Sequence, residues 1–152
     1  MNLIRTTKEQ LEFHLARREK HLLLSLLQLY PCLPSAHQPL SQSGGLPDQE
    51  TSQRLLAEAL AEQREENRRQ LQALLGDPGR FREEETGWRL SLSRADLEWL
   101  LQVLNDIRVG SWVRLGSPEE PLTGLDEKTA PHYAAMEMSG QLQMQFLEAL
   151  QR

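Results

Sequence analysis

Leucines recur at helical spacing in four stretches of the chain, and polar or turn-forming residues separate these stretches. The first stretch predicts a helix over residues 7–29, where leucines three, four and seven positions apart form one face. Pro31 ends this helix, because proline cannot donate the next backbone hydrogen bond. The second stretch predicts a helix from residue 48 or 50 to residue 75, closed by Gly76. Both ends of this helix are apolar and residues 62–70 are almost entirely polar, so its middle is expected to face solvent or a polar partner.

Apolar and polar residues alternate over residues 88–93, which predicts a short extended segment. Ser93 then has the character of a helix N-cap, with Asp96 three positions later in the place of a capping box. The third helix is expected over residues 94–115, and its wide apolar arc predicts a central position. The last helix is expected from about residue 129 to the end of the chain, with a proline in its first turn.

Two loops separate these helices. Residues 31–47 are rich in Pro, Ser and Gly and predict a flexible loop, and a second loop precedes the last helix. The pattern therefore predicts an all-α fold, a bundle of about four helices with two long loops and one short extended segment. Residues 1–152 are expected to form a single helical domain, and no internal repeat is detected along the chain.

Composition narrows the functional classes. Aromatic residues make up only 5% of the chain, and a core of leucine and alanine favours helices over a sheet sandwich. The net charge of −5 argues against a duplex-DNA partner, which requires a basic face. Cys32 is the one cysteine, so an intrachain disulfide is excluded, as fits a reducing cytoplasm. The most apolar run, residues 22–29, is too short to span a bilayer and resembles no signal peptide, so the predicted location is the cytoplasm.

Three stretches resemble a bacterial family known as a domain of unknown function, number two thousand and seventeen. The clearest runs WLLQVLNDIR over residues 99–108 and continues as RLG over residues 114–116. Residues 55–75, with Asn67, are similar to the family's long polar helix, and residues 133–150 are similar to its terminal helix. The resemblance implies a helical bacterial cytoplasmic protein without an established activity. It also suggests a link with an adaptor of an ATP-dependent protease.

The first candidate interaction surface lies on the predicted third helix. Asn105, Arg108 and Trp112 share one face by their three- and four-residue spacing. Arg and Trp are favoured at the energetic centres of protein interfaces, so this group, together with the polar middle of the predicted second helix, predicts a partner-binding surface. In the structural alternative, Asn105 and Arg108 hold a neighbouring loop while Asp106 forms a surface ion pair.

The second candidate group is basic. Arg64, Arg68 and Arg69 lie together on the predicted second helix, which raises the possibility of contact with nucleic acid. Glutamates interleave with these arginines, however, and a pair such as Glu65 and Arg69 is typical of an exposed helix that stabilises itself.

No catalytic, cofactor or metal site follows from the spacing of the remaining side chains. His14 and His21 are seven residues apart, too far along a helix to bind one metal ion directly, and His37 and His132 lack a ligand pattern around them. Cys32 lies among prolines without a nearby base, so it is not expected to act as a nucleophile.

The sequence therefore predicts a non-enzymatic helical protein that acts through protein–protein contacts. It would be a homo-oligomer, an adaptor or a regulator linked to protein turnover. The alternative is a transcriptional regulator that binds nucleic acid through Arg64, Arg68 and Arg69. An unrecognised enzyme or ligand binder ranks last, because local spacing assembles no reactive group.

Overall fold

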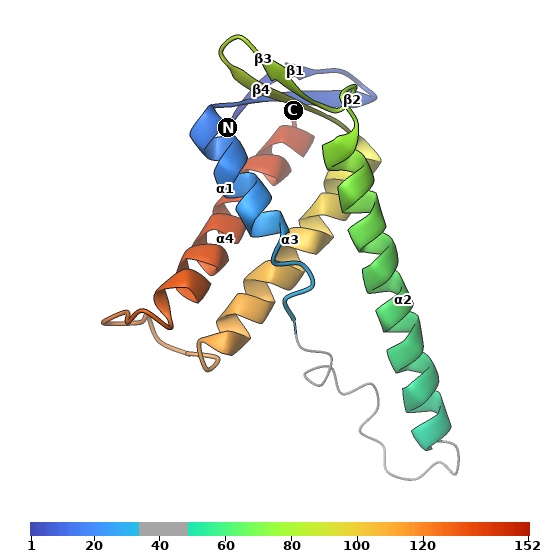
Figure 1. The fold of residues 1–152 in the computed structure, drawn as a ribbon, viewed down its shortest axis with the longest axis vertical. Coiled ribbons are helices and arrows are strands. Elements are labelled where there is room, and N and C mark those ends of the chain that lie inside the picture. The colour runs from blue at the N-terminus through green and yellow to red at the C-terminus, as the bar shows by residue number, and fades with distance from the viewer. Residues whose placement is uncertain (34–48) are drawn as a thin grey trace.

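A computed structural model describes residues 1–33 and 49–152 of the chain. A four-stranded sheet lies at one end of the molecule, and the helices extend from one of its faces (Figure 1). In chain order the elements are β1 (Asn2–Thr6), β2 (Gln10–Leu15), α1 (Arg17–Leu27), α2 (Gln49–Gly76), β3 (Phe81–Glu84), β4 (Gly87–Ser93), α3 (Arg94–Arg114) and α4 (Ala130–Leu150).

The prediction of an all-α fold is wrong, because the described residues form an antiparallel sheet with the strand order β1-β2-β4-β3. The error arose in the first stretch of leucines, where a helix was expected from residue 7. Leu11, Phe13 and Leu15 are buried at alternate positions of β2. Leu11 and Leu15 are also four residues apart, a spacing that fits one face of a helix equally well. Phe13 supplied the signal for a strand.

The other elements lie close to their predicted bounds. Four helices are present in the described residues, and α2, α3 and α4 each begin and end within two residues of the prediction. The extended segment over residues 88–93 is β4, and its partner β3 (FREE) was missed because it has almost no apolar residues. The loop before α4 is confirmed. Beyond residue 33, the predicted loop over residues 31–47 lies outside the described residues.

The sheet reveals an internal repeat that the sequence analysis did not detect. Residues 11–30 correspond to residues 88–107, each 77 positions further along. Within the sheet Phe13 pairs with its own equivalent, Leu90, while Leu11 pairs with Leu92, the equivalent of Leu15. Phe13 and Leu90 therefore lie at the local twofold axis that relates the two strands of this antiparallel pair.

The starts of α1 and α3 repeat as well. The N-cap of α1 is Ala16 and that of α3 is Ser93, and both have extended backbone. Glu19 accepts a hydrogen bond from the Ala16 N–H at 2.7 Å, and Asp96 accepts one from the Ser93 N–H at 3.0 Å. In each half of the sheet, a central strand is thus followed by a helix whose N-cap N–H donates to a carboxylate three residues later.

The core lies between the sheet and the helices. Phe13 of β2 meets Phe146 of α4 edge to face, with ring centroids 5.3 Å apart. Leucines from both central strands and from α1 and α3 surround this pair, and Leu97, Leu100 and Leu104 of α3 are completely buried. The predicted central position of α3 is thus confirmed.

Candidate protein-interaction surface

Among the described residues, the fully buried side chains of helix α2 lie in its C-terminal half. Leu71 and Leu74 are buried, whereas Leu55 and Leu56 are 58% and 45% exposed. Figure 1 shows the N-terminal end of α2 extending beyond the other helices. Residues 50–62 therefore form a projecting segment of the helix, which carries exposed leucines.

The inward-facing stripe of α2 continues into this projecting segment. Positions 57, 60, 64, 67, 71 and 74 alternate in steps of three and four, the spacing of a helix–helix seam. The stripe is buried at 71 and 74, half-buried at 60, 64 and 67, and exposed at Ala57. A cavity of about 310 Å³ beside Pro31 lies along it, lined in part by Ala57, Leu60 and Arg64. Within the part of the chain that the structure describes, the burial of this stripe thus decreases from Leu74 toward Ala57.

Polar side chains of α2 and α3 form hydrogen bonds with residues 32 and 33, which follow α1. Asp106 of α3 accepts hydrogen bonds from the backbone N–H groups of Cys32 and Leu33, at 2.6 and 3.2 Å. Arg64 of α2 donates to the carbonyl oxygen of Leu33 at 2.7 Å. Residues 30–33 are therefore held between the two helices, where they separate α2 from α3.

Asn67 completes this arrangement one turn further along α2. Its Oδ1 accepts a hydrogen bond from Nε1 of Trp99 at 3.0 Å, and its Nδ2 donates to the hydroxyl of Tyr30 at 2.9 Å. The side chain thereby links α2 to α3 and to the end of α1. Trp99, Asp106 and Asn67 are residues on which the family resemblance rested, and in this fold they have structural contacts.

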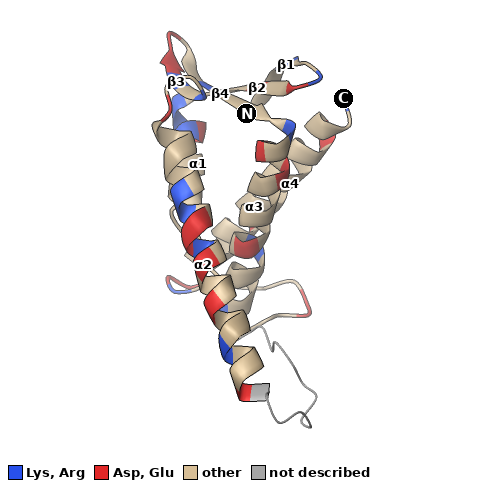
Figure 2. Ribbon diagram, turned by 90° about the vertical axis from the view of Figure 1, so that its right-hand side faces the viewer, with Lys and Arg blue, Asp and Glu red and all other residues tan. Residues whose placement is uncertain are grey.

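Arg64, Arg68 and Arg69 do not form a free basic surface. Arg64 is occupied by Leu33, while Arg68 lies 3.9 Å from Glu65 and Arg69 lies 3.5 Å from Glu66. Figure 2 shows basic and acidic residues following one another along α2. The charges of this helix therefore pair with one another, but the pairs are Glu65 with Arg68 and Glu66 with Arg69, not the expected Glu65 with Arg69.

Asn105, Arg108 and Trp112 lie on the side of α3 away from α2. Asn105 is exposed, Arg108 donates to Oε1 of Gln143 in α4 at 3.2 Å, and Trp112 donates to the carbonyl oxygen of Pro118 at 3.0 Å. Arg108 and Trp112 thus secure α4 and the loop before it. Asp106 was expected to form a surface ion pair, but it accepts hydrogen bonds from backbone N–H groups instead. Because Asn105, Arg108 and Trp112 lie on the other side of α3, they do not form one continuous site with the arginines of α2.

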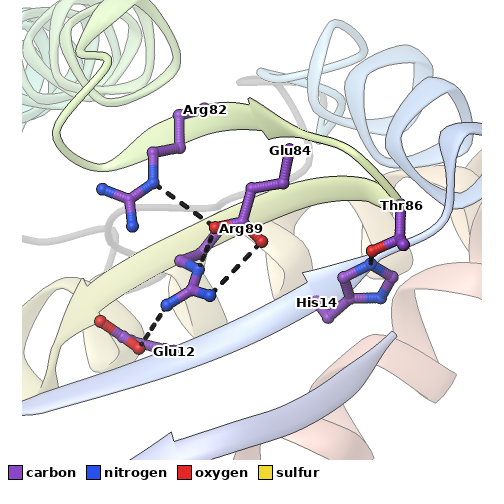
Figure 3. Close-up of polar contacts among 6 residues, drawn as sticks. All are labelled: Glu12, His14, Arg82, Glu84, Thr86 and Arg89. Carbon is purple, nitrogen blue, oxygen red and sulfur yellow. Dashed lines mark hydrogen bonds and ion pairs between the residues drawn. The ribbon is translucent and has the colours of Figure 1, made fainter.

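The face of the sheet that points away from the helices carries a balanced charge cluster. Nη1 of Arg89 lies 3.1 Å from Glu12, and its Nε lies 2.6 Å from Glu84 (Figure 3). Arg82 also approaches Glu84, at 3.7 Å, and His14 lies 3.2 Å from the Thr86 hydroxyl. Since each arginine here faces a carboxylate, the cluster stabilises strand pairing and leaves no excess charge for a ligand.

Among the described carboxylates, those of Glu19 and Asp126 have a lowered pKa, and both lie at helix starts. Burial raises the pKa of Glu19, but hydrogen bonds from the Met1 amino group and the Ala16 N–H outweigh it. The pKa of Asp126 is lowered by the N–H and hydroxyl of Thr129 and by the N–H of Lys128. Hydrogen bonds at the starts of α1 and α4, together with the Met1 amino group, account for these shifts.

In the part of the chain that the structure describes, no three His, Cys, Asp or Glu side chains lie together where they could hold a metal ion. Cys32 is buried beside the hydroxyl of Ser111, 3.8 Å away. His37 lies outside the described residues. Among the described helices, none is both long and apolar enough to cross a bilayer.

Comparisons of the chain with protein-family models, with curated proteins and with solved structures found no match. The resemblance to the bacterial family of unknown function therefore stays a prediction, carried by the residues quoted for it.

Proposed function

We propose that this protein binds a helix of another protein chain along the projecting segment of α2, residues 50–62, and has no catalytic activity. The carrying observation is the seam of α2, whose three- and four-residue spacing continues into a segment where Leu55 and Leu56 are exposed. Exposed apolar positions that extend a buried seam are typical of helix-in-groove or coiled-coil contacts. The partner helix would lie against Leu56, Ala57 and Leu60.

We further propose that this contact serves an adaptor or regulatory role in the cytoplasm. The link with protein turnover rests on the family resemblance alone. Contact with nucleic acid has less support, because Arg68 and Arg69 face glutamates and the chain carries a net charge of −5.

The test compares the wild-type chain with a Leu56→Glu/Leu60→Glu variant. Sedimentation equilibrium measures self-association, and affinity capture from the native host measures other partners. We expect the variant to lose the assembly or the partner while its circular dichroism stays unchanged, because both leucines lie outside the buried core. Leu125→Glu is the control, since Leu125 is 44% exposed in the loop before α4. A wild-type monomer without a partner would contradict the proposal, as would binding that survives in the variant.

A further inference from the structure

The internal repeat places two equivalent positions at helix–helix contacts, and their side chains differ. Trp99 of α3 is the counterpart of Leu22 of α1, 77 positions earlier. The indole of Trp99 packs against the core, and its N–H is bonded to Asn67 of α2. In the second half of the molecule, an indole with an amide acceptor therefore occupies this position.

The corresponding position beside Leu22 is a cavity of about 190 Å³ between α1 and α4. Leu22 is itself 43% exposed, so the cavity opens to the surface. Its walls combine apolar side chains with two side-chain amides: Leu15, Leu22, Leu23, Leu142, Gln141 and Gln145. Met138 of α4 also lines the cavity, and Met1 and Glu19, in contact with each other, complete the lining.

The lining matches the chemistry of the Trp99 site. The amide oxygens of Gln141 and Gln145 can accept a hydrogen bond from a ring N–H, as the amide oxygen of Asn67 does. The volume is below the roughly 300–1,000 Å³ of sites for drug-sized ligands, which suits one bicyclic ring. Apolar walls with a few polar groups are typical of a site for such a ring.

We propose that this cavity binds an indole ring, either as free indole or as a tryptophan side chain of a polypeptide. An indole ring from another molecule would thereby occupy the position that the indole of Trp99 occupies in the second repeat. The proposal is independent of the projecting segment of α2, because no residue of α2 lines the cavity.

The test follows backbone amide NMR shifts of the full chain during titration with indole and with N-acetyltryptophanamide. We expect saturable shifts confined to the residues around the cavity, in α1 and α4 and near Met1 and Leu15, and no such shifts with N-acetylleucinamide. Binding of both indole compounds assigns the site to a tryptophan side chain, whereas binding of indole alone assigns it to the free molecule. Saturable binding of neither one would overturn the proposal.

Leu22→Trp is the decisive variant, because it places the ring of the second repeat into the first. We expect at least a tenfold loss of indole affinity and a higher melting temperature than in the wild type. Leu29→Trp is the matched control, since Leu29 is equally exposed and does not line the cavity. Unchanged indole binding in Leu22→Trp would refute the assignment. If that variant does not fold, Leu22→Phe provides the same comparison.

Discussion

A single carboxylate holds the backbone that leaves α1. Asp106 accepts two N–H groups of residues 32 and 33, and both bonds lie in a partly buried environment. Its neighbour Asn105 is exposed. Of these two adjacent residues, Asp106 is therefore expected to contribute to stability and Asn105 is not. The sequence had placed Asn105, not Asp106, among the candidate site residues.

We predict that Asp106→Ala lowers the free energy of unfolding by about 2–3 kcal/mol, because it leaves two backbone donors without an acceptor. Asn105→Ala should change it by less than about 0.5 kcal/mol, as is usual at the surface. Urea denaturation of the two variants gives both values. Equal effects would show that Asp106 does not anchor residues 32 and 33.

Alanine substitutions at two helical glycines are expected to change the stability of the fold in opposite directions. A Cβ added at Gly110 would lie 2.5 Å from the backbone of Cys32 and Leu33, whereas at Gly140 it would meet only Cδ of Arg108, at 3.9 Å. Gly110→Ala should therefore destabilise the fold by about 1–3 kcal/mol. Gly140→Ala should stabilise it by about 0.5–1 kcal/mol, since alanine is the better helix former. Thermal unfolding compares the two, and a stable Gly110→Ala protein would disprove the close approach.

At the scale of elements, the repeat provides a natural comparison between helix caps. The hydroxyl of Ser93 accepts a hydrogen bond from the Asp96 N–H at 3.0 Å, whereas Ala16 has no such group in the same backbone conformation. We predict that Ser93→Ala costs about 1 kcal/mol and that Ala16→Ser contributes a similar amount. Melting curves test both changes. No gain from Ala16→Ser would mean that the two starts are not equivalent.

The start of α4 depends on an ionised carboxylate. The pKa of Asp126 is lowered in the folded state by its bonds to Thr129 and Lys128. Its contribution is therefore present above the unfolded-state pKa of about 3.9 and is lost as the pH falls through the lower folded-state pKa. Asp126→Ala should melt at a lower temperature than wild type at pH 7, with the gap closing toward pH 2. A gap independent of pH would exclude the charge as the cause.

At the scale of the whole molecule, the two long helices that end near the sheet are anchored differently. α4 lies against α3, with Phe146 and Ala149 buried, whereas α2 is buried only near its C-terminal end. We predict that in monomeric protein the amides of residues 52–62 exchange with solvent at least tenfold faster than those of residues 68–75. Hydrogen exchange followed by NMR measures both segments. Uniform protection along α2 would indicate that something covers the projecting segment.

The sequence alone determined α2, α3 and α4, because long leucine stripes and explicit caps such as Ser93 with Asp96 fix a helix locally. It also identified the polar middle of α2 and the extended character of residues 88–93. On one helix, charged side chains of alternating sign form ion pairs with their near neighbours. The sequence therefore also indicated that glutamates balance the charge of Arg68 and Arg69.

The tertiary structure decided the sheet, the repeat and the role of Asp106. Leu11 and Leu15 satisfy both helical and strand periodicity, and pairing with β1 and β4 selects the strand. β3 could not be predicted from the sequence, because it is almost wholly polar and is stabilised by its pairing with β4. Asp106 and Asn67 act on backbone and side chains more than 30 positions away, and no local pattern records such distant partners.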